Sequence, residues 1–296
     1  MIYHHPLAYL IGMEGLALLR AWAGDYGYDR QFVTARLAEV RRLLDDERLT
    51  GHAGVLVERG ATEAAYRQWS VSYDSPNGLF DLDEPLLDEI IDPLPIGDAV
   101  DAACGTGRLA ARLVRRGHRV VGVDSSLEML QRARRRLPDT DFVAGDLQCL
   151  PMADASVDLV VTGLALSHVA DLEPVFADFA RVLRRDGHLV VSDVHDDLVL
   201  LGSVVKAVGP DGQPQLATTH RHTVADFLRA ALATGFSVRR FEEHPRPTAP
   251  EGPTQEATDE IGSWSDWPWT LLGLVPEATR AAWNNPAVTV WHFQRG

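Results

Sequence analysis

Cysteine is scarce in this sequence, which has Cys104 and Cys149 and no other cysteine among its 296 residues. Two cysteines do not build a disulfide framework, and neither belongs to a cluster with the spacing of zinc ligands. We therefore expect no bound metal ion, and a reducing compartment such as the cytoplasm.

Positive charge is also in short supply. The chain has 28 Lys and Arg against 42 Asp and Glu, which gives a formal net charge of −14. A surface of this sign repels phosphate backbones, so no nucleic-acid partner is expected. The arginines at 132 and 134–136 form a basic run. We interpret them as a solvated helix end, where positive side chains favour the helix dipole.

Long apolar runs are missing too. The apolar stretch within residues 1–19 carries Glu14, has no basic segment in front of it, and is too short to cross a bilayer. Neither a membrane partner nor a signal peptide is expected. Apolar residues at 46% and charged residues at 24% are typical of a globular chain with a buried core.

Two kinds of pattern divide the chain. Between Leu7 and Leu44 apolar residues recur at helical spacing, and a further helical stretch ends at the turn-forming sequence SPNG. Residues 1–75 are predicted to form a helical cap or lid, whose helices could also join two copies in a homodimer. Beyond Gly97 the pattern alternates between strand, glycine turn and helix, which predicts an α/β domain with a parallel sheet over 76–296.

The end of the chain holds two β-rich segments, FSVRRFEEH and AVTVWHFQRG. They predict a closing antiparallel pair of strands. An insertion near residues 245–285 separates them.

A glycine-rich turn lies within DAVDAACGTGRLA, residues 98–110, between a predicted strand and a predicted helix. Such a turn brings backbone N–H groups close to a ligand. Gly105, Gly107 and Ala110, with Asp124 further on, also fit the dinucleotide fingerprint, so an NAD(P)-dependent oxidoreductase is one interpretation. Asp101 and Asp146 add negative charge that a pyrophosphate would disfavour, and Asp101 is suited to an ammonium group.

Four segments carry a more specific resemblance: DAACGTG, VVGVDSSLEML, FVAGDLQCLPM and LRRDGHLVVSDV. In order and spacing they resemble the motifs of class I S-adenosylmethionine-dependent methyltransferases that act on small molecules. The resemblance covers residues 66–194. It implies a Rossmann-like sheet of seven mostly parallel strands in the order 3-2-1-4-5-7-6, flanked by helices, with strand 7 antiparallel. It also implies S-adenosyl-L-methionine as cofactor and S-adenosyl-L-homocysteine as product.

Matching positions imply the cofactor contacts, which follow the ligand from one end to the other. At the methionine end the resemblance implies Asp101, Ala102, Ala103, Gly105, Gly107, Gly163 and Leu164. At the ribose and adenine it implies Asp124, Ser125, Met129, Asp146 and Leu147. The lid contacts would come from Tyr66 and Tyr73. The family usually has glycine where this chain has Ala103, so an extra methyl group is expected to tighten the pocket.

Methyl transfer needs in-line approach of the acceptor, and a hydroxyl acceptor also benefits from a general base. His168 follows the predicted fourth strand and His195 the fifth, so both are candidates for that base. Either could instead hold a loop by hydrogen bonds. His220, His222 and Trp267 are predicted to line the substrate pocket. Ordinary packing is the alternative for Trp267, and the two neighbouring histidines lack the third ligand of a zinc site.

The sequence therefore predicts methyl transfer from S-adenosylmethionine to an O, N or C atom of a small-molecule acceptor. Three alternatives stay open at this point. They are an S-adenosylmethionine-binding enzyme with non-methylating chemistry, an NAD(P)-dependent oxidoreductase, and a binding protein with a degenerate pocket.

Overall fold

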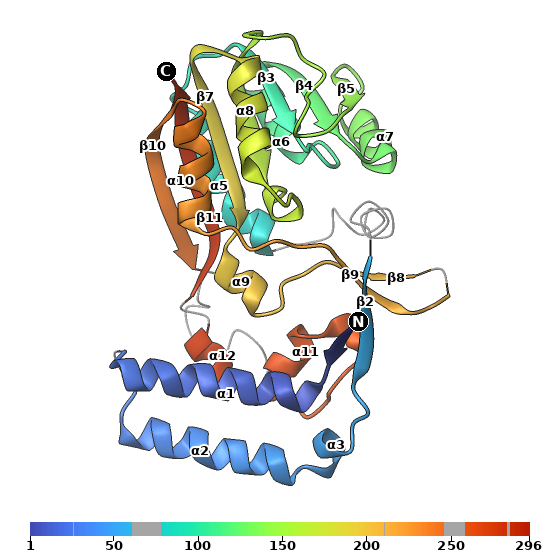
Figure 1. Ribbon diagram of the computed structural model, residues 1–296, viewed down its shortest axis with the longest axis vertical. Helices are drawn as coiled ribbons and strands as arrows, with labels where there is room; N and C mark the ends of the chain where they lie inside the picture. The colour runs from blue at the N-terminus through green and yellow to red at the C-terminus, as the bar shows by residue number, and fades with distance from the viewer. Residues whose placement is uncertain (26, 61–77, 210, 246–257, 283–284) are drawn as a thin grey trace. The chain divides into compact units, whose positions relative to one another are not determined.

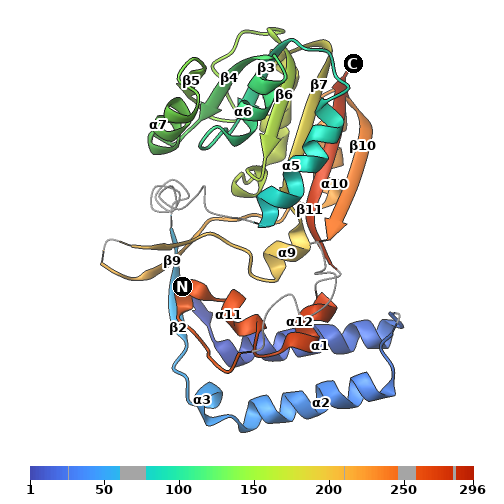
Figure 2. The same ribbon diagram turned by 180° about the vertical axis from the view of Figure 1, so that it is seen from behind.

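A computed structural model describes residues 1–25, 27–60, 78–209, 211–245, 258–282 and 285–296. The chain divides into two compact units, which Figures 1 and 2 show with their elements labelled. Unit 1 consists of Met1–Arg59, Val208–Leu216 and Pro245–Asn285, and unit 2 of Gly60–Ala207, Ala217–His244 and Pro286–Gly296. The predicted boundary at residue 75 falls outside the described residues.

Unit 2 is built on a seven-stranded sheet. From one edge to the other its strands are β10 (Phe236–Pro245), β11 (Pro286–Arg295), β7 (Leu183–Val194), β6 (Val157–Gly163), β3 (Asp98–Ala102), β4 (Arg119–Asp124) and β5 (Asp141–Ala144). Strands β5, β4, β3, β6 and β7 pair in parallel, and β11 pairs antiparallel with β7. Counted in chain order and from the β5 edge, this is the order 3-2-1-4-5-7-6 that the resemblance implied.

Helices cover both faces of this sheet (Figures 1 and 2). They are α5 (Gly78–Ile91), α6 (Arg108–Arg115), α7 (Leu127–Arg136), α8 (Leu172–Val182) and α10 (Val224–Ala233). A 3₁₀ turn, η1 (Leu166–His168), follows β6, and α9 (Asp196–Leu200) follows β7. Successive strand residues point to opposite faces. Val160 accordingly packs in the core that holds Phe176 of α8, whereas Val161 packs in the core that holds Leu113 of α6. Burial on both faces explains the apolar runs of the central strands.

Unit 1 combines helices with a small sheet. Its helices are α1 (Pro6–Ala23), α2 (Arg30–Asp45), α3 (Glu47–Thr50), α11 (Trp269–Leu272) and α12 (Pro276–Ala282), with a 3₁₀ turn, η2 (Trp264–Asp266). The sheet has the order β1 (Ile2–His4), β2 (Val55–Gly60), β9 (Pro214–Ala217), β8 (Lys206–Val208). Unit 1 holds β1, all but the last residue of β2 and of β9, and Val208 of β8. A buried ion pair of 2.9 Å between Arg36 of α2 and Glu14 of α1 joins the two long helices.

The N-terminal helices agree with the helical periodicity of the sequence, whereas the small sheet was not predicted. None of the helices in the described part of the chain combines the length and the apolarity needed to cross a membrane.

Candidate functional site

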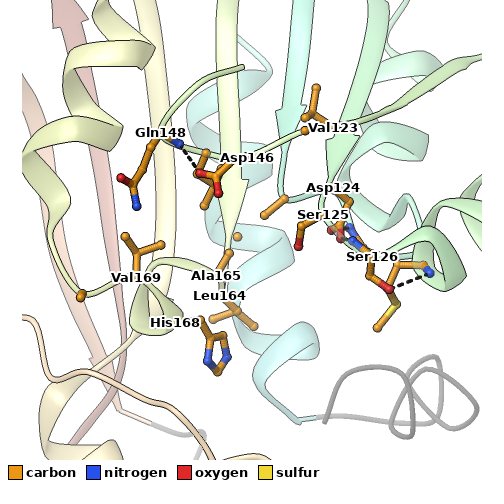
Figure 3. Close-up of a pocket in the computed structure, with 17 residues that line it drawn as sticks. Val123, Asp124, Ser125, Ser126, Asp146, Gln148, Leu164, Ala165, His168 and Val169 are labelled. Carbon is orange, nitrogen blue, oxygen red and sulfur yellow. Dashed lines mark hydrogen bonds between the residues drawn. The ribbon is translucent and has the colours of Figure 1, made fainter. Parts of the chain in front are cut away.

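A cavity of about 290 Å³ opens in unit 2 at the carboxyl ends of β3, β4, β5 and β6. In a parallel sheet this is where the strand order reverses and where ligands bind. The residues that line it come from the ends of these strands and the loops that follow: Ala103, Gly105, Val123, Asp124, Ser125, Ser126, Met129, Gly145, Asp146, Leu147, Gln148, Gly163, Leu164, Ala165, His168, Val169 and Ala170. Figure 3 shows Asp124 and Ser125 on one side, Gln148 and Val169 on the other, and His168 beside Leu164.

The glycine-rich turn after β3 has a left-handed backbone at three positions. Gly105 has φ 54° and Gly107 φ 78°, values that glycine adopts without a steric penalty. Ala103 has φ 59°, where its methyl group is strained, and this explains why the family usually has glycine there. A Cβ on Gly107 would lie 3.2 Å from the ring of Phe142. Gly107 therefore packs toward the core and begins α6, and it does not line the cavity.

Asp101 lies beneath this turn and is 1% exposed. Its Oδ2 accepts a hydrogen bond of 2.7 Å from the backbone N of Ala110, while Oδ1 has no hydrogen-bond partner among the described residues. Burial raises the pKa of Asp101 to about 7. A buried acceptor without a donor is costly, and an ammonium group would satisfy it. Neither Asp101 nor Ala102, which packs in the core, borders the cavity directly.

Asp124 ends β4 and faces the cavity. Each carboxylate oxygen accepts one backbone N–H at 2.8 Å, from Gly105 and from Ser126. Burial raises its pKa. Each oxygen has a second acceptor site, so the same carboxylate can accept from two vicinal hydroxyl groups. This fits the ribose that the resemblance assigned to it.

The far side of the cavity is formed by the loop after β5. Asp146 is exposed, and its Oδ1 accepts a hydrogen bond of 2.7 Å from the backbone N of Gln148. The carboxylate keeps further acceptor sites toward the cavity. Leu147 lines the cavity beside it. Met129 of α7, 1% exposed, adds a soft apolar contact to the lining of the cavity. This apolar pocket with one acceptor fits a flat heterocycle that bears an amino group.

His168 lies in η1 and lines the cavity. Its Nδ1 is 3.1 Å from the carbonyl oxygen of Thr218. Since a carbonyl oxygen only accepts, Nδ1 carries the proton, and the lone pair of the neutral ring is on Nε2. Burial lowers the pKa of His168 below its ordinary value. The ring is therefore neutral at physiological pH, as a general base must be.

His195 is placed differently, at the start of α9 and outside the lining of this cavity. Its Nδ1 accepts a hydrogen bond of 3.1 Å from the backbone N of Asp197, so Nε2 carries the proton. Nε2 lies 3.2 Å from Oε1 of Glu243. The lone pair of the neutral ring thus already accepts a hydrogen bond. With Asp196 and Asp197 the ring offers possible metal-ligand atoms within 4.8 Å of one another, but Asp196 pairs with Arg221 at 3.0 Å.

The predicted substrate-pocket residues lie outside the lining of the cavity as well. His220 donates its backbone N–H to Ser167 at 2.6 Å, and Nε2 of His222 donates to the carbonyl of Val169 at 2.7 Å. Trp267 is in unit 1, where it is 5% exposed and packs against His52. Its contribution to a substrate pocket stays a prediction. The predicted lid residues, Tyr66 and Tyr73, lie outside the described residues.

Several lining residues were not predicted. Each is adjacent or nearly adjacent in sequence to a predicted one, so the strand ends that identified their neighbours also pointed to them. They are Val123, Ser126, Gly145, Gln148, Ala165, Val169 and Ala170.

Known proteins match this chain in the part that builds the cavity. A family described as a methyltransferase domain matches residues 100–191. A malonyl-[acyl-carrier protein] O-methyltransferase of Yersinia pestis is 30% identical over 190 residues, 62% of this chain and 70% of that protein. A demethylmenaquinone methyltransferase of Renibacterium salmoninarum is 37% identical over 108 residues, 36% of this chain and less than half, 46%, of that protein.

Solved structures share the fold. The structure of a DhpI–SAH complex aligns with a TM-score of 0.54 at 21% identity, covering 79% of this chain and 95% of that one. SAH is S-adenosylhomocysteine, and the carboxylate acceptors of Asp101, Asp124 and Asp146 fit the ammonium, hydroxyl and amino groups of such a ligand. Motifs, sheet order and relatives agree, and the chain belongs to the class I S-adenosylmethionine-dependent methyltransferases.

Proposed function

We propose that this enzyme transfers a methyl group to an O, N or C atom of a small organic acceptor, with His168 as general base when the acceptor is a hydroxyl. The observation that carries the proposal is the position of His168 on the wall of the cavity with its proton held on Nδ1. A bound S-adenosylmethionine supplies a sulfonium methyl group that is electrophilic.

The cofactor contacts follow from the carboxylate acceptors in the cavity and beneath the glycine turn. Asp101 beneath the glycine turn attracts the ammonium group, Asp124 accepts the two ribose hydroxyls, and Asp146 accepts the adenine amino group. These roles are supported by the orphaned Oδ1 of Asp101 and by the remaining acceptor sites of Asp124 and Asp146. Gly163 and Leu164, at the end of β6, border the methionine end.

The residues that follow Leu164 in the chain then contact the acceptor. Holding the acceptor in line at about 3–3.5 Å supplies much of the rate by proximity alone. For a hydroxyl acceptor, Nε2 of His168 takes the proton as the new bond forms, a step worth roughly 10²–10⁴ in rate. His195 is less suited, because the lone pair of its neutral ring already accepts from the backbone N of Asp197.

The relatives differ in what their names say they methylate, a malonyl-[acyl-carrier protein] in one case and demethylmenaquinone in the other. We therefore propose a panel of carboxylic acids, phenols, quinols and amines, scored by release of S-adenosylhomocysteine and by product mass. A product that has gained one CH₂ group supports methyl transfer. Conversion of an acceptor without release of S-adenosylhomocysteine would contradict it and favour a non-methylating reaction.

Two further expectations belong to this proposal. A homodimer through the N-terminal helices is supported by Leu19 and Trp22 of α1, which are 66% and 91% exposed. Light scattering on the purified protein tests it, and a monomer would contradict it. A cytoplasmic location is proposed from the low cysteine content.

A further inference from the structure

The 145–156 loop, which joins β5 to β6, carries Asp146, Leu147 and Gln148 at the wall of the cavity. Its cavity-facing part is a tight turn, closed by a hydrogen bond of 3.1 Å from the backbone N of Cys149 to the carbonyl oxygen of Asp146. Inside the turn, Oδ1 of Asp146 accepts from the backbone N of Gln148, as Figure 3 shows. The direction in which the Asp146 carboxylate points is therefore set by the placement of the whole turn.

Both ends of this turn are attached to neighbouring elements. At its start, the backbone N of Gly145 donates to the carbonyl of Asp124 on β4, at 3.1 Å. At its end, α8 binds both backbone groups of Leu150: the N–H donates to Oδ2 of Asp178 at 2.6 Å, and the carbonyl oxygen accepts from Nη2 of Arg181 at 3.0 Å. Leu150 is 2% exposed, so little water can replace these bonds if α8 releases them.

Asp178 and Arg181 also hold each other and the rest of the loop. They lie three residues apart on α8, so their side chains are neighbours on one face of the helix. Nε and Nη2 of Arg181 donate to the two carboxylate oxygens of Asp178, at 2.7 and 3.1 Å. Nη1 donates to the carbonyl of Met152 at 2.7 Å and to Oδ1 of Asp154 at 2.8 Å. One planar guanidinium thus joins α8 to Leu150, Met152 and Asp154.

Apolar packing holds the same loop in a less specific way. The side chains of Leu147, Leu150 and Met152 pack against the main core of unit 2. Such contacts are non-directional, so they keep the loop on the core without fixing how its peptide groups are turned. Hydrogen bonds depend on direction, and those on the two backbone groups of Leu150 fix the orientation in which the chain leaves the turn.

We infer that Asp178 and Arg181 are a positioning pair for the purine base of the cofactor. By fixing Leu150, they set where the turn after β5 presents the Asp146 carboxylate, and with it the preference for an amino group over an oxo group on the base. An amino group donates to this carboxylate, whereas an oxo group would bring two acceptors together. The inference rests on the proposed contact between Asp146 and the adenine amino group.

The test compares two ligands by calorimetry on the full-length protein. S-adenosylhomocysteine carries the amino group and S-inosylhomocysteine an oxo group in its place, so the ratio of their Kd values reports this one position. Arg181→Met keeps an unbranched side chain without the guanidinium, and Arg181→Lys keeps the charge and one donor group. Arg184→Met is the matched control, because Arg184 also makes two ion pairs, with Asp98 and Asp158, but at the amino ends of β3 and β6.

We expect the wild type to prefer S-adenosylhomocysteine at least about tenfold, the effect of one hydrogen bond to a charged group. Arg181→Met should lower this preference roughly threefold or more, Arg181→Lys less, and Arg184→Met less than about twofold, because a loosened turn loses part of that bond. Asp146→Ala should also lower it, and adding Arg181→Met should lower it no further, since both changes act on one contact. A general loss of stability would weaken both ligands equally and leave the ratio unchanged.

Amide hydrogen exchange in the unliganded protein follows the turn without any ligand. In Arg181→Met the N–H groups of Gln148 and Cys149 should exchange at least about tenfold faster than in the wild type, because the turn opens more often. In Arg184→Met both should exchange at the wild-type rate.

Unchanged exchange at these two amides would overturn the inference. An unchanged Kd ratio in Arg181→Met, with a lowered ratio in Asp146→Ala, would overturn it as well, and so would a further loss in the double variant. A ratio that Asp146→Ala leaves unchanged would instead reject the adenine contact of Asp146, and the exchange rates would still decide whether α8 positions the turn. If Arg181→Met does not fold, Arg181→Lys tests the inference with changes in the same direction.

Discussion

Replacing Asp101 by Asn should stabilise the unliganded protein and weaken its hold on the cofactor. Burial raises the pKa of Asp101 from 3.8 to about 7. A folded-state pKa above the unfolded value means that the folded protein favours the neutral carboxyl, so stability is lost as pH rises from about 4 through 7. Three pH units at 1.36 kcal/mol each give a cost of about 4 kcal/mol at pH 8.

Asn removes this cost, because it is neutral at every pH and its oxygen can still accept from the backbone N of Ala110. Its amide brings N–H groups into a site without acceptors, which costs roughly 1–3 kcal/mol. The net effect at pH 8 is a gain of about 1–3 kcal/mol in the free energy of unfolding. Below about pH 4 the gain disappears, and Asn is then the less stable side chain.

Cofactor binding should change in the opposite direction. A hydrogen bond between an ammonium group and a carboxylate contributes about 1.5–3 kcal/mol, so Asp101→Asn should raise the Kd for S-adenosylhomocysteine roughly 10- to 150-fold. Methylthioadenosine, which lacks the amino-acid end, should bind the variant as it binds the wild type. Asp193→Asn is the control. Asp193 is also buried with its pKa raised to about 7, but it lies on β7, which β6 separates from β3 and its glycine turn.

Urea denaturation between pH 4 and 8 measures the stability, and isothermal titration calorimetry measures both ligands. The Asp193 variant should gain stability at high pH and keep its affinity. Unchanged affinity of the Asp101 variant for S-adenosylhomocysteine would refute the ammonium contact. An equal loss in both variants would show that the effect is not local.

Three other substitutions test the site. Asp124→Ala should weaken the binding of S-adenosylhomocysteine by about 1–3 kcal/mol, because the hydrogen bonds to the ribose are lost. An unchanged binding free energy in calorimetry would reject this position for the ribose. His168→Gln should lower kcat for a hydroxyl acceptor roughly 10²–10⁴-fold with cofactor affinity retained. In the wild type the acid limb of the pH profile of kcat should lie below pH 6.5, because burial lowers the pKa of His168. Equal kcat values for the wild type and His168→Gln would leave proximity as the mechanism. Ala103→Gly should raise stability by up to about 1 kcal/mol by removing left-handed strain at φ 59°. A lower melting temperature would contradict this.

The sheet and the cavity could be predicted from the sequence because each depends on local order. A strand, a glycine turn and a helix in succession place the residue after the strand at the carboxyl edge of the sheet. The family resemblance assigned Asp124, Asp146 and Gly163 to the cofactor, and each lies at or just after a strand end. The position of a residue within its motif was enough to locate it, and the residues that it contacts in the fold did not have to be known.

Features that depend on distant partners could not be predicted. His195 contacts Glu243 of β10, which is separated from it by 48 positions in sequence, and no local pattern indicates this contact. Trp267 packs against His52, and only the fold of unit 1 brings these residues together. The motif suggested that Gly107 contacts the cofactor, but which way its Cα faces depends on where Phe142 of β5 packs.

The most direct test of the account is calorimetric titration of the purified protein with S-adenosylmethionine, S-adenosylhomocysteine and NADH. We predict saturable one-to-one binding of the first two ligands, at micromolar concentrations, and no binding of NADH. Binding of NADH alone, or of none of the three, would contradict the assignment of this cavity to S-adenosylmethionine.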